Sequence, residues 1–194
     1  LIIEHAIARE ALRLAFEQHK KLAVELKGVQ QQRTISEAFA QTETGNTLVS
    51  MFDLNLIVGS GGVLSHAPRR QQSMLMMIDA FLPEGVTQLA VDSIFMMPQL
   101  GVLSQVNKEA ATQVFNRDCL IHLGTCIAPA GQAKKGSSCL EISVNMPSGI
   151  VEDIIPVGEL KLYQIGMDEV VQVKIQPNRH FDAGAGNGQV VETE

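Results

Sequence analysis

The stretch "DLNLIVGSGGVLSHAPRRQQ", residues 53–72, decides the fold. The largely apolar Leu54–Val58 predicts a buried strand, because apolar runs of this length between turn residues are typical of one. Pro68, a little further on, suits the first turn of a helix. Glycine costs conformational entropy and is tolerated where the backbone turns sharply or lies close to another group. The chemistry of this stretch therefore depends on what approaches its cluster Gly59, Ser60, Gly61 and Gly62.

Strands and helices alternate on the carboxyl side of this cluster. A helix from Pro68 to about Pro83 has one apolar face, and "TQLAVDS" (87–93) predicts a second short strand. Two short helices follow, the second of them over 107–115. This alternation is typical of an α/β fold. The apolar positions of the helix that begins near Pro68 are Met74, Met77, Ile78 and Phe81. Those of the first short helix are Phe95, Leu100 and Leu103.

Residues 1–23 predict an amphipathic helix, the kind whose apolar stripe faces a core. Its apolar positions are separated by three and four residues. Further on, "TISEAF" (34–39) has the pattern of a helix start and "TETGNT" (42–47) is turn chemistry. The stripe of the first helix consists of Ile3, Ile7, Ala11, Leu14 and Ala15.

The character of the sequence changes near residue 117. Four runs rich in Val, Ile and Leu follow, divided by turns such as "PAGQAKKGSS" (129–138). Such runs predict a small all-β module, either a sandwich or a barrel. We divide the chain at 116–118, into an α/β portion (1–116) and a β-rich module (117–194). The runs are "CLIHLGTCIA", "SCLEISVNM", "IIPVGELKLYQI" and "VVQVKIQP".

Composition narrows the classes of function. The 194 residues carry a net charge of −6, which argues against nucleic acid or an anionic membrane as the partner. The longest apolar runs are far shorter than the roughly 20 residues of a membrane span. The chain starts at Leu1 and ends in "VVETE", so we expect it to be a piece of a longer protein.

The three cysteines are spaced too irregularly for a disulfide framework or a C-x-x-C pair. We expect Cys119, Cys126 and Cys139 to be free thiols in a reducing cytoplasm. No His, Cys or acidic residues cluster with the spacing of a metal site, and His66 and His122 are isolated. The methionines at 74, 76, 77, 96 and 97 fit core packing on two helices better than a soft-metal site.

The glycine cluster has two interpretations. It allows a tight strand-to-helix turn with close packing, which the motif alone favours, and it also allows close approach of an adenine or a ribose. It matches neither the dinucleotide fingerprint G-x-G-x-x-G nor a P-loop.

Three other places have both a functional and a structural interpretation. Asp92, at the end of a predicted strand, suits either a metal or ribose ligand or a helix cap, and capping is favoured. Arg69 and Arg70 suit either phosphate or a solvated surface, and the latter is favoured. "GAGNG" (184–188) resembles a phosphate loop but is followed by no clear helix, so a flexible turn is favoured.

The string "LIVGSGGVLSHAPRRQQSMLMMIDAF…GVTQLAVDSIFMMPQLGVLS" closely resembles the accessory protein family of glutamate mutase, a coenzyme-B12-dependent enzyme. The likeness is densest over 53–104. This family is similar to the actin, sugar-kinase and heat-shock-chaperone ATPases. The resemblance implies the carboxyl-terminal part of an actin-like fold. It also implies an adenosine-binding element formed by Gly59, Ser60, Gly61 and Gly62, with Val63 and Leu64 behind.

The resemblance further implies ATP and Mg²⁺ as cofactors of the longer protein and B12-dependent mutase subunits as partners. The acidic, glycine-bearing phosphate hairpin of that superfamily has no match here. We therefore expect no ATP hydrolysis and no bound cofactor in this chain alone. The implied function is chaperone-like reactivation of the mutase by exchange of spent cobalamin. Two alternatives stay open, namely a structural module that docks a mutase subunit and a part of a hydantoinase-like ATP-dependent hydrolase.

Overall fold

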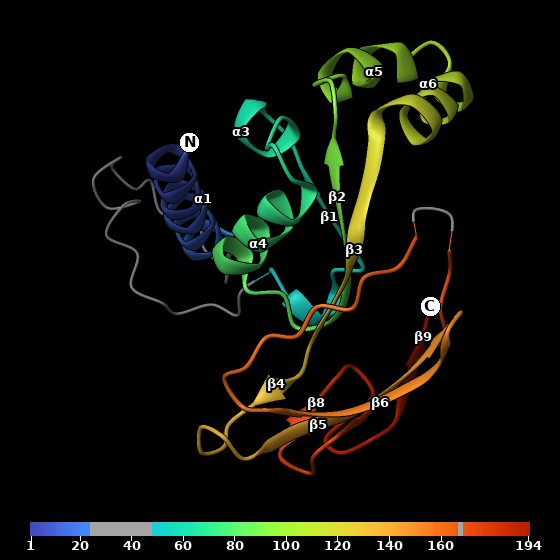
Figure 1. The fold of residues 1–194 in the computed structure, drawn as a ribbon. Helices are drawn as coiled ribbons and strands as arrows, with labels where there is room; N and C mark the ends of the chain where they lie inside the picture. Colours follow the sequence, from blue (N-terminus) through green and yellow to red (C-terminus); the bar gives the residue numbers. More distant parts are fainter. Residues whose placement is uncertain (24–47, 167–168) are drawn as a thin grey trace, which may run out of the picture.

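The computed structural model describes residues 1–23, 48–166 and 169–194 of the chain (Figure 1). Two separate groups of strands are present, and the described helices gather around the first of them. The predicted mixed α/β class is therefore confirmed. The helix start and the turn expected at 34–39 and 42–47 lie outside the described residues. No described helix has the length and apolar character of a membrane span.

The first sheet has three strands, in the order β1 (Leu56–Gly59), β2 (Gly85–Asp92) and β3 (Leu120–Ala128). β2 pairs in parallel with β1 and antiparallel with β3. This strand confirms the prediction at 87–93. Because it is hydrogen-bonded on both sides, its carboxyl half is fully buried, and the residues with no exposed surface are Thr87, Leu89, Ala90, Val91 and Asp92.

The strand predicted at Leu54–Val58 forms two residues later and is not buried along its length. β1 pairs with β2 along one edge, and the part of the chain described here places no strand on its other edge. Leu56 is consequently 42% exposed, whereas Gly59 at the carboxyl end is buried. An apolar run shows that a strand forms but does not show how many neighbours it has.

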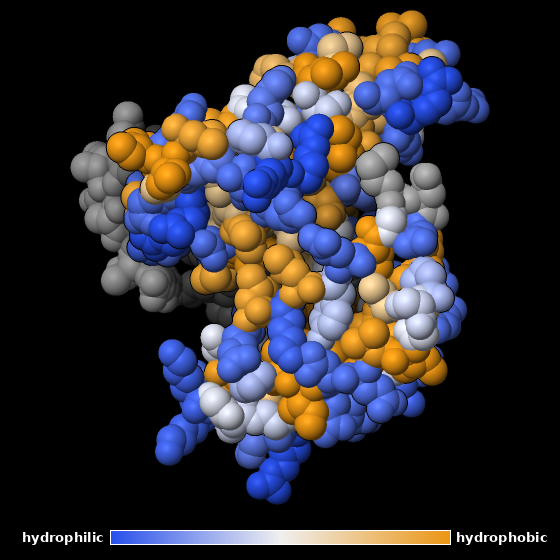
Figure 2. Space-filling model, in the orientation of Figure 1, coloured by the Kyte–Doolittle hydropathy of each residue, from blue (hydrophilic) through white to orange (hydrophobic). Residues whose placement is uncertain are grey.

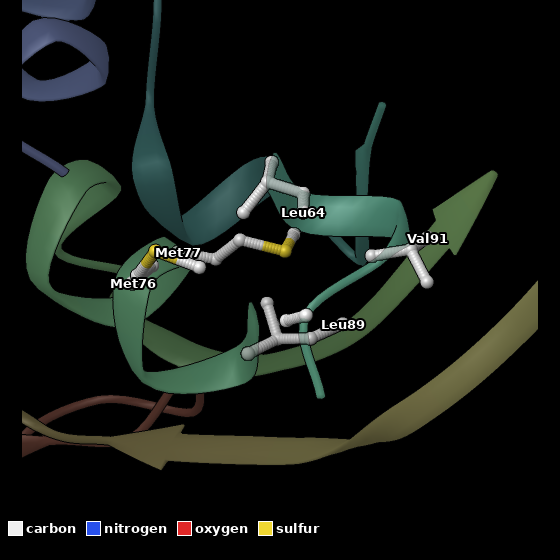
Figure 3. Packing of buried hydrophobic residues seen from close by; sticks show 6 residues of the cluster. Leu64, Met76, Met77, Leu89 and Val91 are labelled. Atoms are coloured by element: carbon white, nitrogen blue, oxygen red, sulfur yellow. The ribbon is translucent and has the colours of Figure 1, made fainter. Parts of the chain in front are cut away.

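Helices α3 (Gly62–Ser65) and α4 (Arg70–Phe81) cover one face of this sheet. Their buried side chains meet those of β2 in the main core, where Leu64 and Met77 lie over Leu89 and Val91 (Figure 3). The predicted apolar face of α4 is confirmed, because Met77 is fully buried. Its other members pack against the same core, namely Met74, Ile78 and Phe81.

Helix α1 (Ile2–Leu22) packs along α4 (Figure 1), but through a different face from the predicted one. The rings of Phe16 and Phe81 meet edge to face at 5.2 Å, and Leu12 reaches the main core. The predicted stripe instead faces outward, with Ile3 76% and Ile7 64% exposed. The helix carries apolar side chains on two opposite faces, and periodicity alone does not show which of them is buried.

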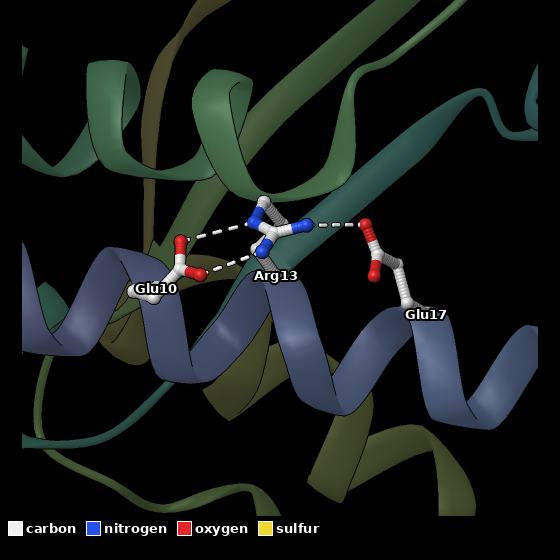
Figure 4. Close-up of polar contacts among 3 residues, drawn as sticks. All are labelled: Glu10, Arg13 and Glu17. Carbon is white, nitrogen blue, oxygen red and sulfur yellow. Dashed lines mark hydrogen bonds and ion pairs between the residues drawn. The ribbon is translucent and has the colours of Figure 1, made fainter.

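The polar side of α1 carries a group of ion pairs. Arg13 lies between Glu10 and Glu17 and donates hydrogen bonds to both carboxylates (Figure 4). The Arg13 guanidinium lowers the pKa of the Glu10 carboxyl. Arg9 also joins α1 to α4 through a 3.1 Å ion pair with Asp79. These pairs are exposed, so each contributes little to stability.

Helices α5 (Met97–Ser104) and α6 (Lys108–Val114) lie beyond the carboxyl end of β2 (Figure 1). A π-helical turn, η2 (Phe115–Cys119), then leads into β3. The Asn107 side chain caps α6 by accepting a hydrogen bond from the Ala110 amide at 3.0 Å. Two helices form as predicted, and their small core consists of Leu100, Ala111 and Cys119. Phe95, which was predicted on the first of them, instead precedes α5 with φ 58°, and both Phe95 and Leu103 are exposed.

The second sheet has the order β6 (Gly149–Pro156), β5 (Ser138–Met146), β7 (Val173–Pro177) and β9 (Val191–Thr193). A short pair, β4 (Ala130–Gly131) and β8 (Phe181–Asp182), lies beside it. A 3-10 turn, η1 (Met51–Asp53), precedes β1. The core of this part is formed by Leu140, Ile142, Val144, Val171, Ile175 and Ala183.

The change from one sheet to the other comes after Ala128, which differs from the division made at 116–118. The run 119–128 was expected in the β-rich module, whereas β3 pairs with β2 over eight residues of the first sheet. Val86 and Ile127 of this sheet also pack against the core of the second. Side chains of the first sheet therefore pack directly against the core of the second, and the two parts are not joined by a linker alone.

Limited proteolysis tests the description of the β4–β5 connection. Residues 131–138 are exposed, and they include Lys134 and Lys135. Exposed connections are cut before packed elements. Trypsin should cut first at one of these lysines, as identified by mass spectrometry of the fragments. Earlier cleavage within 69–82 would contradict the packing of α4.

Candidate functional site

The glycine cluster lies at the carboxyl end of β1, where the chain turns into α3. Gly59 is paired with Val91 in the parallel β1–β2 ladder, so this turn and the end of β2 share one edge of the sheet. In open α/β sheets, ligands bind outside the carboxyl ends of parallel strands. We refer to residues 59–62 as the glycine turn.

Two of the three glycines are explained by the fold itself. A side chain on Gly59 would place its Cβ 2.9 Å from Leu64 Cδ1 and 3.0 Å from Met77 Sδ, so this glycine allows α3 and α4 to pack closely on β1. Gly61 has φ 95° and ψ 157°, a backbone region that is essentially restricted to glycine. Its Cβ would meet nothing within 4 Å.

Gly62 is not explained in this way. Its φ lies outside the left-handed region, and a Cβ built on it meets no atom within 4 Å. Nearby, the Ser60 hydroxyl is buried and has no hydrogen-bond partner within the described residues. The open face over Gly62 leaves room for a bound molecule, whereas the Ser60 hydroxyl is buried and is not accessible to one.

A buried contact links α3 to the end of β2. The Ser65 hydroxyl donates a 2.5 Å hydrogen bond to the Asp92 carbonyl. The Asp92 carboxylate in turn accepts from the backbone N–H groups of Ile94 (3.4 Å) and Met97 (3.0 Å). Asp92 has no exposed surface. It holds the connection to α5 by accepting from the first amide of that helix, although Met96 and not Asp92 is the N-cap residue. The buried carboxylate is not accessible as a ligand for a metal or ribose.

Ser65 was not predicted as part of the site. Its partner lies 27 residues away in the sequence, and nothing in the local pattern indicates that contact. Arg70 also differs from the expected solvated arginine, because its guanidinium donates a 2.8 Å hydrogen bond to the Ser65 carbonyl. At Arg69 the backbone N–H donates to the Gln72 side chain at 3.1 Å and starts α4.

An apolar groove of about 540 Å³ lies beside the glycine turn, between the first turns of α1 and α3. Val63, the residue after Gly62, forms one wall. Glu4 is the one lining residue with a charged side chain among those described. The remaining wall consists of Leu1, Ile3, Ile7 and Ala8.

The remaining candidates are the "GAGNG" segment, the two isolated histidines and a possible metal site. In "GAGNG", the Asp182 carboxylate accepts hydrogen bonds from the amides of Gly184 (2.7 Å) and Gly186 (2.9 Å), and the short β9 follows rather than a helix. His66 and His122 are exposed. Within residues 1–23, 48–166 and 169–194, no three His, Cys, Asp or Glu side chains could hold a metal ion.

The methionines and cysteines also have structural roles. Met76 and Met77 are buried in the main core, as predicted. The three cysteines are free, and Cys119 is buried. Burial raises the pKa of the Cys126 thiol to about 11 and also raises the pKa of the other two thiols. Because the thiolate is the nucleophile and metal ligand, these cysteines are poorly suited to either role at neutral pH.

A comparison with protein families gives the class of the protein. The model of the family described as MutL protein matches residues 1–119, which is more than half of the chain. The chain therefore belongs to the MutL protein family, whose name here denotes the accessory proteins of glutamate mutase. No curated protein and no solved structure gives a significant match to the chain. The match includes the glycine turn and ends where η2 leads into β3.

Single alanine substitutions separate the roles of the three glycines. Gly59→Ala should lower the free energy of unfolding by about 1–3 kcal/mol, because Leu64 and Met77 must move. Gly61→Ala should lower it by a similar ~1–3 kcal/mol, because of its backbone conformation. Gly62→Ala should leave it unchanged or raise it by up to about 1 kcal/mol. The measurement is urea unfolding followed by circular dichroism. A loss at Gly62 as large as that at Gly59 would show that Gly62, too, is required by packing.

Proposed function

We propose that this chain acts in an ATP-dependent, chaperone-like accessory protein that reactivates coenzyme-B12-dependent glutamate mutase by cofactor exchange. In this proposal the glycine turn holds the adenosine of ATP. Membership of the MutL protein family supports the association with glutamate mutase. The actin-like origin of the fold and the role of ATP are parts of the proposal.

The observation that supports nucleotide contact is the open face over Gly62. Close packing accounts for Gly59, and backbone conformation accounts for Gly61, but neither accounts for Gly62. A base or sugar lying against the backbone here would exclude a side chain at this position.

The apolar groove beside Val63 supplies the rest of the proposed contact. Its wall is aliphatic, so it suits the face of a purine base, which is removed from water on binding. The Glu4 carboxylate at its edge is an acceptor for an exocyclic amine. We propose that the base lies against Val63 and the ribose against Gly61 and Gly62.

The residues of this site bind and orient a ligand, and none of them is proposed to catalyse a reaction. ATP, when bound and hydrolysed, would supply the free energy for cofactor exchange on the mutase. This chain would contribute the adenosine contact. We assign none of its residues to the phosphates or to Mg²⁺, so no hydrolytic step is derived from it.

Nucleotide contact by this chain should be weak, because none of its residues is assigned to the phosphates. It can be tested by titrating ¹⁵N-labelled chain with ATP up to millimolar concentrations and following the backbone amide signals. The amides of residues 59–63 should shift. Gly62→Val should weaken this binding at least tenfold, because the side chain would occupy the ligand's place, while the melting temperature is retained. Gly101→Val is the matched control, since Gly101 also lies in a helix and its Cβ would meet nothing within 4 Å.

Two outcomes would contradict the assignment. If Gly62→Val folds and binds ATP as tightly as the unchanged chain, the glycine turn serves packing alone. If ATP shifts no amide in 59–63, the alternative of a structural module that docks a mutase subunit is favoured. Recovery of activity by an inactivated glutamate mutase, with and without ATP, measures the proposed reactivation itself.

A further inference from the structure

An exposed apolar surface covers α5 and the connection that leads into it. Figure 2 shows hydrophobic side chains gathered over this helix, at the top of the view. Its most exposed members are Val106 at 88% and Val102 at 72%. We call the following residues the α5 surface: Ile94, Phe95, Val102, Leu103 and Val106.

The α5 surface contains no charged residue. From Ser93 to Asn107 the sequence has no Asp, Glu, Lys or Arg, although most of these residues are at least partly exposed. Exposed apolar patches rimmed by polar residues mark interaction sites. The central parts of protein interfaces are depleted in charge and enriched in aromatic residues, and the α5 surface has no charged residue and includes Phe95.

The backbone at Phe95 is held in an unfavourable conformation. Its φ is 58°, in the left-handed region that a bulky residue rarely adopts, and its side chain is 55% exposed. The Asp92 carboxylate fixes both sides of this residue through the amides of Ile94 and Met97. A strained residue persists only where the surrounding structure imposes it, and such residues cluster at functional positions. The buried Asp92 carboxylate thus fixes the backbone around Phe95, whose ring is exposed to solvent.

We propose that the α5 surface binds the α5 surface of a second copy of this chain. The chain has a net charge of −6, so two copies repel each other over most of their surfaces. An uncharged patch is where two copies can meet without bringing like charges together. A patch that pairs with itself about a twofold axis is the commonest interface of homodimers. The first charges at its edge, Lys108 and Glu109, are of opposite sign.

The same reasoning disfavours the other exposed apolar surfaces for self-pairing. The outward stripe of α1, with Ile3 and Ile7, is flanked by Glu4 and Glu10. Ile154 on the edge strand β6 lies next to Asp153. Ion pairs lie at both places, because Glu10 pairs with Arg13 and Asp153 pairs with Lys161. A twofold pairing there would take these charges out of water, which costs free energy.

The size of the α5 surface sets the expected strength of the pairing. A standard interface buries about 800 Å² on each partner. Five partly exposed side chains supply a smaller apolar centre than that. The pair should therefore be weak and depend on protein concentration.

Analytical ultracentrifugation of the chain over a range from micromolar to millimolar tests the proposal. The unchanged chain should show a monomer–dimer equilibrium. Ile94→Lys should weaken the dimer at least tenfold, because a charge would be buried without a partner. Ile154→Lys is the matched control, since both isoleucines are 57% exposed and both changes alter the net charge equally. The control should leave the dimer unchanged, and neither variant should alter the melting temperature.

A second variant keeps the test independent of introduced charge. Phe95→Asn removes the ring but retains a residue that tolerates the left-handed backbone. It should weaken the dimer at least tenfold without lowering the melting temperature. The proposal is overturned if the unchanged chain is monomeric at the highest concentration. It is also overturned if Ile94→Lys and Ile154→Lys act equally, or if the α5 surface binds a mutase subunit and not a second copy.

Discussion

The rest of the structure depends on the burial of β2. This strand is hydrogen-bonded to β1 in parallel and to β3 antiparallel, and its carboxyl half has no exposed surface. Leu89 and Val91 contribute to the main core under α3 and α4, whereas Val86 reaches the core of the second sheet. A backbone group left unpaired in such a place costs free energy, so the strand fixes the register of both of its neighbours.

The same constraint places the candidate site. Because β1 runs parallel to β2, Gly59 and Asp92 come to the same edge of the sheet, although they lie far apart in the sequence. The Ser65–Asp92 hydrogen bond then ties the first helix after the glycine turn to the end of β2. Asp92 also holds the connection that presents Phe95. The glycine turn and the α5 surface are thus anchored by one buried residue.

Much of this fold could be predicted from local pattern. The helix at Arg70–Phe81 and the strand at Gly85–Asp92 follow from apolar periodicity and turn residues. The buried face of α1 could not be predicted, because both of its faces carry apolar side chains. The partner of β3 could not be predicted either, since alternation in 119–128 shows that a strand forms but not which strand it pairs with.

The candidate site was predictable in its position but not in its details. The glycine cluster was visible in the sequence, yet only tertiary contacts separate Gly59, which Leu64 and Met77 crowd, from Gly62, which nothing crowds. The roles of Ser65 and Arg70 likewise depend on contacts made after folding. Family resemblance, rather than spacing, led to adenosine as the expected ligand.

The central claim is that adenosine lies against the backbone of the glycine turn. The most direct measurement is the set of intermolecular nuclear Overhauser effects between ATP and the ¹⁵N-labelled chain. Contacts are expected from the ribose H1′ and the adenine H8 to the amides of Gly61 and Gly62. Contacts from bound ATP that fall on other parts of the chain, with none to residues 59–63, would contradict the claim.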